Sequence, residues 1–464
     1  MNYLYLLAAL LFVFGIKRLA TIKTCRSGNR LSEIGMFIAV VATLAIATGL
    51  NWYVVVGGIL VGGTVGLVIA KRTPTTEMPE MVAALNGFGG IASSLVALSD
   101  LITRSGGLEA GKAVGEQFSL VYAISAPVTV LIGFVTFTGS GIAYLKLGGK
   151  KLVHPVNGVM RHYVHALLAL AAIGCSALMV TTESTTTVTV MAILLVLVSA
   201  ALGVLLVMPI GGADMPVVVS LLNSYSGIAG AAAGFVIENP VLVVVGALVG
   251  TSGLILTQIM CKAMNRSLGN VLLGGIGDDS VAEDARDYKS IKKTSPEEVA
   301  MLLDGASSCI FVPGYGLAVA QAQHIVRDLA DQLTARGCQV RYAIHPVAGR
   351  MPGHMNVLLA ESDVPYDQLW EMERINNDFK NTDVVIVVGA NDVVNPAARE
   401  DTGPIAGMPI LDVDHARTVI VIKRSLSPGY AGIKNPLFDN DNTLMVFMDA
   451  KEALEEMVKE VKEL

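Results

Sequence analysis

The segment that carries the most structural information reads Cys309-Ile310-Phe311-Val312-Pro313-Gly314-Tyr315-Gly316-Leu317-Ala318-Val319-Ala320. Its first four residues are typical of a buried strand, and a helix is predicted over residues 317–336. The pattern G-x-G-x-x-V lies between them. The first Gly permits a tight turn, and the second would let backbone N–H groups approach a pyrophosphate at the helix N-terminus. The segment therefore predicts a dinucleotide site.

Strand and helix patterns alternate around this segment. Further helices fit residues 366–376 and 450–462, and another begins at Ser295-Pro296-Glu297-Glu298, with Ser as N-cap and Pro in the first turn. Several of the expected strands are β-branched runs, typical of parallel strands buried on both faces. They lie at residues 309–312, 340–344, 384–388, 410–411, 419–423 and 444–448. This order predicts a doubly wound, Rossmann-like α/β domain with a parallel sheet.

The end of the second strand departs from an ordinary NAD site. An acidic residue is expected there, on the ribose 2′-hydroxyl, but the chain has His345-Pro346 followed by residues 347–352, which include Arg350. Lys423-Arg424-Ser425 end the fifth strand at the same edge. Fixed positive charge and hydroxyl donors suit a 2′-phosphate. The sequence therefore favours NADP over NAD, the alternative being a solvated strand end.

The chain has two parts of different composition. Of its 464 residues 53% are hydrophobic and 16% are charged, against roughly 25% charged in an ordinary globular protein. Residues 1–262 hold 14 Lys and Arg and 9 Asp and Glu, whereas residues 263–464 hold 19 and 30. We expect the first part in lipid and the second in water. The acidic balance of the second part argues against nucleic acid as a partner.

Nine segments of the first part are long enough for a transmembrane helix, which needs roughly 20 mostly apolar residues. They lie at about 3–22, 34–51, 53–70, 82–102, 120–145, 162–181, 187–208, 217–236 and 240–261. In the first, the positive charges follow the apolar run, so we expect a retained span rather than a cleaved signal peptide. The predicted organisation is a helical membrane domain at 1–262, a flexible linker at 263–294 and a soluble domain at 295–464.

Positive charges predict the orientation of the spans. With the N-terminus outside, the inner segments hold 13 Lys and Arg, and the outer loops hold two, Arg104 and Lys112. An odd number of spans then places the C-terminal domain in the cytoplasm.

Polar side chains in the spans are costly there and mark candidate functional positions. Asn86 lies in the fourth span, Ser220, Asn223 and Ser224 share one face of the eighth, and Asp214 precedes it. One interpretation is a water-bearing proton path with Asp214 as the contact to the soluble domain. The other is helix–helix hydrogen bonding, with Asp214 as a helix N-terminal charge. The five cysteines show no paired metal spacing, so no metal site is predicted.

Several blocks are similar to a known family. They lie at residues 211–217, 222–227, 261–266, 313–316, 345–350, 389–392 and 423–425. In these blocks, and over nearly its whole length, the chain resembles the beta subunit of the proton-translocating nicotinamide nucleotide transhydrogenase. The resemblance implies a proton-conducting membrane domain and a cytoplasmic domain that binds NADP(H), in reversed orientation relative to the ordinary Rossmann pose.

The resemblance also implies roles for individual residues. The pyrophosphate turn would be Gly314, Tyr315 and Gly316, with Val319 in the following helix. A second phosphate-side loop would be Val347, Ala348, Gly349, Arg350, Met351 and Pro352. The nicotinamide side would be lined by Gly389, Ala390, Asn391, Asp392 and Val393, with Gly407 and Met408 on a further loop. The 2′-phosphate clamp would be Lys423, Arg424 and Ser425. Gly429, Tyr430 and Ala431 would close over the cofactor, and Asp449 and Ala450 would complete the edge.

A partner is implied as well. In the family, hydride passes directly between NADP(H) on this subunit and NAD(H) on an alpha-type subunit, with Re/Si specificity, while inward proton flow favours NADPH. The resemblance further implies dimeric assembly and a bacterial cytoplasmic membrane. Hydride transfer needs positioning and exclusion of water rather than a general base, so no acid–base catalyst is assigned.

One position departs from the family. Many members have a histidine where this chain has Asn86. An amide cannot titrate near neutral pH. The proton relay is therefore expected on the partner's helices or in water that passes Asn223.

Two other functions stay open from the residues alone. The first is a transporter or channel gated by NADP(H), without redox chemistry, whose soluble domain acts as a sensor. The second is a stand-alone dehydrogenase with a membrane anchor. Nine spans with polar faces exceed what an anchor requires, and the sequence shows no acid–base pair for a substrate.

The charge distribution generates a topology prediction. A reporter fused after Leu464 should report a cytoplasmic position, and a tag placed before Met1 should be accessible from outside, because positive loops stay inside. The measurement is protease and thiol-reagent accessibility in intact cells. Finding both ends on one side would contradict the nine-span arrangement.

Overall fold

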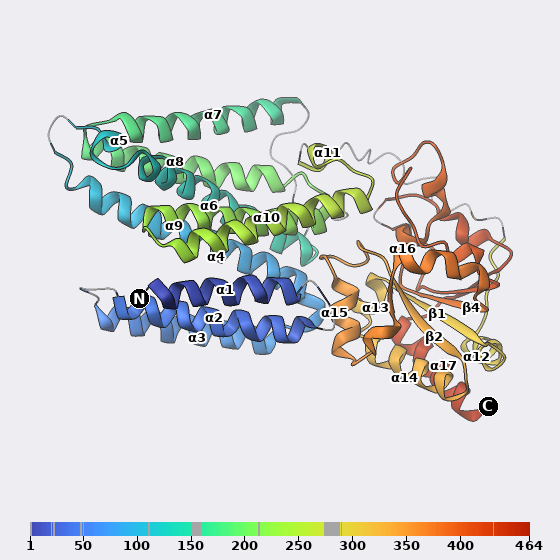
Figure 1. The fold of residues 1–464 in the computed structure, drawn as a ribbon. Helices are drawn as coiled ribbons and strands as arrows, with labels where there is room; N and C mark the ends of the chain where they lie inside the picture. Colours follow the sequence, from blue (N-terminus) through green and yellow to red (C-terminus); the bar gives the residue numbers. More distant parts are fainter. Residues whose placement is uncertain are drawn as a thin grey trace. The chain divides into compact units, whose positions relative to one another are not determined.

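The computed structural model describes residues 2–19, 21, 24–46, 49, 51–109, 112–150, 152, 159–211, 214–272, 288, 290–429 and 431–464. They form two compact units. One comprises Met1–Pro209 with Val218–Thr257, and the other comprises Ile210–Val217 with Gln258–Leu464. Figure 1 shows long helices in the first unit and a sheet with flanking helices in the second. The domain limits expected from the sequence stay predictions.

Long apolar helices make up the first unit. In the described part of the chain, helices lie at all nine expected spans: α1 (Asn2–Leu19), α2 (Cys25–Ile46), α3 (Trp52–Arg72), α4 (Met78–Ser105), α6 (Leu120–Leu147), α7 (Val159–Thr181), α8 (Thr185–Val207), α9 (Met215–Val236) and α10 (Pro240–Ala263). Short helices lie at η2 (Thr75–Glu77), α5 (Val114–Gln117) and α11 (Leu268–Leu272). Eight of the nine, all except α1, are long and apolar enough to cross a membrane. The predicted multi-pass helical bundle is confirmed.

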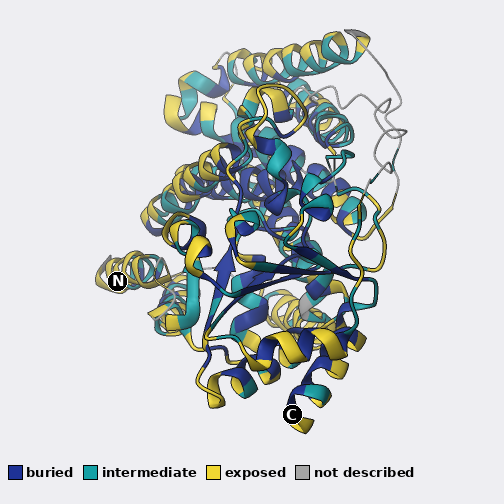
Figure 2. Ribbon diagram, turned by 90° about the vertical axis from the view of Figure 1, so that its right-hand side faces the viewer, coloured by how far each residue is buried: buried dark blue, intermediate teal, exposed yellow. Residues whose placement is uncertain are grey.

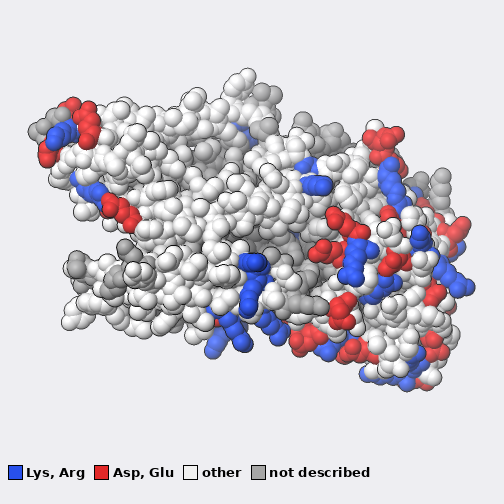
Figure 3. Space-filling model, in the orientation of Figure 1, with Lys and Arg blue, Asp and Glu red and all other residues white. Residues whose placement is uncertain are grey.

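Charge separates the two units on the molecular surface. In Figure 3 the helices of the first unit are almost entirely uncharged, whereas Lys, Arg, Asp and Glu cover the second. A lipid-facing surface must be apolar, because charged side chains are costly in hydrocarbon. The compositional split near residue 262 thus corresponds to a change of surroundings.

Small residues bring membrane helices close together at two contacts. Between α4 and α6, a Cβ on Gly133 would collide with the carbonyl of Gly90. Between α9 and α10, a Cβ on Gly246 would collide with the backbone nitrogen of Ala231. Close backbone approach of this kind drives helix association where lipid supplies no hydrophobic effect. By contrast, Gly62 on α3 has no atom within 4 Å of such a Cβ in the described part of the chain.

Six parallel strands form the sheet of the second unit. They are β1 (Ser308–Pro313), β2 (Gln339–Ile344), β3 (Leu369–Glu371), β4 (Val384–Val388), β5 (Thr418–Ile422) and β6 (Thr443–Val446). Their order is β3-β2-β1-β4-β5-β6. All pair in parallel; Ile310, for example, lies between Arg341 and Val385. Every residue of β4 is buried, as its Val-Val-Ile-Val-Val sequence predicts. The expected doubly wound fold is confirmed.

Two apolar cores cover the faces of this sheet, whose strands are dark blue in Figure 2. One core is closed by helices α12 (Pro296–Asp304), α13 (Tyr315–Val319), α14 (Gln323–Ala335), α15 (His354–Glu361) and α17 (Ala450–Glu463). The other is closed by α16 (Met372–Ile375) and the short helices η7 (Asn376–Asn381), η8 (Asp392–Val394), η10 (Val413–His415) and η11 (Pro436–Asp439).

Several elements differ from the sequence prediction. Residues 410–411 form no strand, and the sixth strand is instead β3, inside the expected helix 366–376, between η6 (Tyr366–Gln368) and α16. The expected helix 317–336 is two helices, because Gln321 adopts a positive φ of 50°. Short apolar runs do not distinguish strand from helix by period alone.

Residues before α12 also depart from the expected flexible linker. The amide of Met445 in β6 donates to the carbonyl of Lys292, and the amide of Thr294 donates to the carbonyl of Met445. Lys293 pairs with Met445 as an isolated parallel bridge. This end of the predicted linker thus extends the sheet beyond β6.

The glycine contacts generate a stability prediction for the membrane unit. Gly246 lies on α10 against α9. Gly246→Ala should destabilise the membrane unit by about 1–3 kcal/mol, because the added methyl group would overpack this contact. Gly62→Ala is the matched control. Gly62→Ala should be neutral or stabilising by up to about 1 kcal/mol, because this position has room for a methyl group and alanine has a higher helix propensity than glycine.

Both variants can be measured by thermal denaturation of the detergent-solubilised full chain. Equal melting temperatures for the two variants would contradict the assigned close approach.

Candidate functional site

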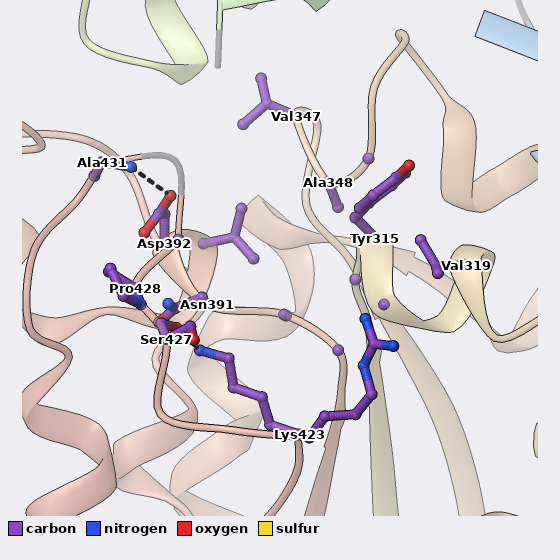
Figure 4. Close-up of a pocket in the computed structure, with 18 of the residues that line it drawn as sticks. Tyr315, Val319, Val347, Ala348, Asn391, Asp392, Lys423, Ser427, Pro428 and Ala431 are labelled. Carbon is purple, nitrogen blue, oxygen red and sulfur yellow. Dashed lines mark hydrogen bonds between the residues drawn. The ribbon is translucent and has the colours of Figure 1, made fainter. Parts of the chain in front are cut away.

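A cavity of about 700 Å³ opens at the carboxyl edge of the sheet. It is lined by the turn after β1, the loops after β2, β4 and β5, and the start of α17. In Figure 4, Tyr315 and Val319 come from the α13 side, whereas Asn391, Ser427 and Pro428 lie across from them. Ligands of open α/β sheets bind at this edge, where the strand order reverses. Here β1 and β4 are the adjacent strands at that reversal.

Most of the predicted site residues line this cavity. They are Gly314, Tyr315, Gly316, Val319, Val347, Ala348, Gly349, Gly389, Ala390, Asn391, Asp392, Val393, Met408, Lys423, Arg424, Ser425, Gly429, Ala431, Asp449 and Ala450. Residues from six separate segments are thus brought together. Their roles in binding a cofactor stay predictions.

Four predicted residues are not among the lining residues, and one cannot be placed. Arg350, Met351, Pro352 and Gly407 do not line the cavity, and Tyr430 lies outside the described residues. Sequence reasoning missed several lining residues: Met264, Arg266, Pro404, Ile405, Ile422, Ser427, Pro428 and Met448. Ser427 and Pro428 continue the Lys423-Arg424-Ser425 loop and could have been included on that ground. Isolated apolar residues such as Ile405, Ile422 and Met448 show no sequence pattern that would predict a place in a cavity lining.

The glycines of the turn after β1 contact the turn after β4. The amide of Gly314 donates to Val388 O, and the amide of Gly316 donates to Gly389 O, both at 2.9 Å. A Cβ on Gly316 would lie 2.6 Å from the Cα of Gly389, which itself has a positive φ of 64°. Glycine is needed here so that two backbone turns can touch. These two amides donate to carbonyl groups inside the protein. The role of this turn in holding a pyrophosphate stays a prediction.

The loop after β2 is held by two neutral histidines. Val347 N donates to Nδ1 of His345 at 3.2 Å, so Nε2 carries the proton and donates to Pro409 O at 2.8 Å. Arg350 N donates to Nδ1 of His354 at 3.1 Å. Burial lowers the pKa of each imidazole to about 4. His345 therefore ties the loop after β2 to the Pro409 loop and carries no charge at neutral pH.

Arg350, the cation expected at this strand end, contacts an aromatic residue of the cavity lining, and its role toward a cofactor stays a prediction. Its guanidinium lies over the ring of Tyr315, 4.2 Å from the centroid, and the residue is not part of the cavity lining. This stacking is a cation–π contact. It supports the aromatic wall of the cavity from behind.

Lys423 and Arg424 are the cations of the β5 end of the cavity. In Figure 4, Lys423 extends toward Asn391 and Ser427, and its ammonium donates to the carbonyl of Ser427. Burial lowers the pKa of Lys423 to about 8, and the charge of Asp392 opposes this shift only in part. Within the described residues, neither Lys423 nor Arg424 forms an ion pair with a carboxylate. The cavity lining thus holds one half-buried and one exposed cation, Lys423 and Arg424, without a direct carboxylate partner in the described part of the chain.

The loop after β5 folds back on the end of β4. Ala431 N donates to Oδ2 of Asp392 at 3.1 Å, drawn as a dashed line in Figure 4. A Cβ on Gly429 would collide with the same carboxylate. Asn435, which is fully buried, donates through Nδ2 to the carbonyl of Asn391 at 3.2 Å. Asn391 and Asp392 thereby join the cavity floor to the loop above it.

The sequence pattern of the family described as NAD(P) transhydrogenase beta subunit matches residues 1–460. The chain belongs to this family. Two relatives named NAD(P) transhydrogenase subunit beta, both from Rhodospirillum rubrum and one of them from a specified strain, are 46% identical over 466 residues. The match covers 98% of this chain and 97% of each relative. The resemblance inferred from the sequence blocks is confirmed.

Membership in the transhydrogenase beta subunit family carries consequences for the whole chain. It makes the chain part of a transhydrogenase, an oxidoreductase that acts on nicotinamide nucleotides, and implies an alpha-type partner subunit. With the eight apolar helices α2–α4 and α6–α10, it identifies a multi-pass membrane protein. Across the residues that the structure describes, no group of three or more His, Cys, Asp and Glu side chains could hold a metal ion.

The polar groups of the membrane helices mostly join one helix to another. Ser220 donates to Gly253 O at 3.1 Å, and Ser224 donates to Gly250 O at 2.6 Å, so both hold α9 to α10. Asn86 donates to Val219 O at 3.1 Å, from α4 to α9. These contacts agree with the interpretation of helix–helix hydrogen bonding. Asn223, on the same face, is only half-buried. A proton path along this face stays a prediction.

Asp214 has a partner of its own. Its carboxylate lies 3.5 Å from the guanidinium of Arg266, and the side chain is largely buried. An ion pair in such surroundings is sensitive to loss of either partner, because the remaining charge stays buried. A coupling role for Asp214 stays a prediction.

Proposed function

We propose that this chain binds NADP(H) in the cavity at the carboxyl edge and exchanges hydride with NAD(H) on the alpha-type subunit, coupled to inward proton movement through the helical unit. The observation that carries the proposal is the pair of cations on the cavity lining, the half-buried Lys423 and the exposed Arg424, neither of which forms an ion pair with a carboxylate among the described residues. A 2′-phosphate would supply the missing anion. NAD(H), which lacks this phosphate, would leave the cations unpaired.

The cavity residues fit a phosphorylated dinucleotide in charge and in shape. Charge-assisted hydrogen bonds from Lys423, Arg424 and the Ser425 hydroxyl suit a phosphate dianion. On the other side, the wall formed by Tyr315, Val347 and Ala348 is mainly apolar, as pockets for flat cofactors usually are. The glycine contact between the turns after β1 and β4 leaves the space between these walls open.

Nicotinamide supplies the hydride chemistry, and the protein's part is positioning. No acid–base catalyst is required among the cavity residues. We infer that the loop of Gly429 and Ala431, held to Asp392, covers the cofactor and excludes water. Coupling would then be a two-state event, in which proton occupancy in the helical unit biases the cavity between open and closed forms.

The assembly and orientation follow from the same proposal. We place the chain in a bacterial cytoplasmic membrane with its N-terminus outside and its α/β domain in the cytoplasm, paired with an alpha-type subunit and assembled as a dimer. Because Asn86 cannot titrate near neutral pH, the proton relay would lie on partner helices or in water near Asn223.

The depressed pKa of Lys423 predicts a pH dependence of NADP⁺ binding. Above pH 8 the free site loses its ammonium charge, whereas the bound phosphate favours the charged form. Affinity should therefore be constant below pH 8 and fall by up to about tenfold per pH unit above it. Lys423→Met should weaken NADP⁺ binding by roughly 10- to 100-fold and abolish this pH dependence.

These quantities can be measured by calorimetric titration of the full chain with NADP⁺ and NAD⁺. The matched control is Lys459→Met, a substitution on the exposed face of α17. Equal affinity of the wild-type chain for NADP⁺ and NAD⁺ would refute the assignment of the cavity.

Hydride exchange distinguishes a transhydrogenase from an NADP(H)-gated channel. The full chain, reconstituted with its alpha-type subunit in sealed vesicles, should reduce a spectroscopically distinct NADP⁺ analogue with NADH and change the lumenal pH. Lys423→Met should slow the reduction. Ion movement that responds to NADP(H) without any hydride exchange would favour the channel.

A further inference from the structure

A short segment before α12 lies along the outer edge of the sheet. Lys292 and Thr294 exchange backbone hydrogen bonds with Met445 of β6, and the ammonium of Lys292 lies 3.1 Å from the carboxylate of Asp441. Ile291 packs against the apolar core on one face of the sheet. Residues 290–294 are thus fastened to β6 by backbone, charge and apolar contacts.

Tyr288, which precedes this segment in the sequence, contacts the end of the loop after β5. Its hydroxyl oxygen accepts a hydrogen bond from the backbone N–H of Asn435 at 3.2 Å. Its ring packs against Phe438 with 5.9 Å between centroids, and the ammonium of Lys434 lies 4.8 Å from the same ring. Burial raises the pKa of this phenol, so it stays protonated at neutral pH.

Asn435 is the residue at which the loop after β5 returns to the core. It is fully buried. Its Oδ1 accepts from Leu437 N at 3.0 Å, and its Nδ2 donates to the carbonyl of Asn391 at 3.2 Å. Through Asn391 it is joined to the cavity lining. With the Asn435 side chain so occupied, its main-chain N–H depends on Tyr288 for an acceptor.

We propose that Tyr288 is a positioning residue that holds residues 431–435, the returning end of the loop after β5, and thereby sets how long NADP(H) stays in the cavity. The inference rests on the proposed function, because it names a determinant of ligand release from that same site. Without the hydroxyl, the buried N–H of Asn435 loses its partner. A buried donor left unsatisfied favours any conformation in which it meets water, and here that conformation is an opened loop.

The substitution Tyr288→Phe isolates the hydroxyl, because the ring and its contacts with Phe438 and Lys434 remain. Tyr342→Phe is the matched control in the same unit. Tyr342 is also buried, on β2, and its hydroxyl has no hydrogen-bond partner among the described residues. Tyr288→Leu removes the ring as well and reports the contribution of packing.

Two measurements on the detergent-solubilised full chain test the inference. The first is amide hydrogen exchange in peptides that cover residues 425–438, without ligand. Tyr288→Phe should speed exchange there by about tenfold, and Tyr342→Phe should not. The second is the rate of NADP⁺ release, followed by displacement. It should rise by about five- to tenfold in Tyr288→Phe, while the melting temperature and the KM for NAD(H) with the alpha-type subunit stay as in the wild type.

The outcomes separate the two proposals. Unchanged loop exchange in Tyr288→Phe, or an equal increase in Tyr342→Phe, overturns the positioning role. Faster loop exchange with unchanged NADP⁺ release overturns the link to residence time. Failure of the wild-type chain to bind NADP⁺ would instead overturn the proposed function, and the loop exchange would still decide whether Tyr288 holds the loop.

Discussion

The contact between the turns after β1 and β4 is the constraint on which the cavity depends. Gly314 and Gly316 meet Gly389 backbone to backbone, and two hydrogen bonds join these turns. A side chain at any of the three positions would separate the carboxyl ends of two central strands. Because β1 and β4 mark the reversal of strand order, this contact defines the floor from which the cavity walls diverge.

Electrostatics supports the proposed preference of the cavity for a phosphorylated cofactor. The loop after β2 carries a buried, neutral His345, and Arg350 stacks on Tyr315 outside the lining. Positive charge is thereby concentrated at the other end, on Lys423 and Arg424 after β5. Burial lowers the pKa of Lys423, as expected for a cation that has no carboxylate in direct contact with it. An anionic group of the ligand is the natural completion of such a site.

Much of this arrangement was predictable, and the failures have physical causes. The strands at 309–312 and 384–388 were predicted because β-branched runs in parallel sheets are buried on both faces. The missed strand β3 has only three residues, too few for a period to show. Most lining residues were named through the family resemblance, and they meet in one cavity because loops at the carboxyl ends of parallel strands converge. The contact of Arg350 with Tyr315 was not predictable, because sequence places a residue on a loop without giving the direction of its side chain.

Sequence alone determined the division into an apolar helical part and a charged α/β part, the parallel order of strand and helix, and the transhydrogenase beta subunit family. These are properties of composition, local period and block order. Tertiary structure decided which polar groups form hydrogen bonds inside the protein. Gly316 N donates to Gly389, Ser224 donates to the carbonyl of Gly250, and the hydroxyl of Tyr288 accepts from Asn435, a residue 147 positions away. Such partners are distant in the chain, and only packing in three dimensions determines which polar groups meet and which remain available to a ligand.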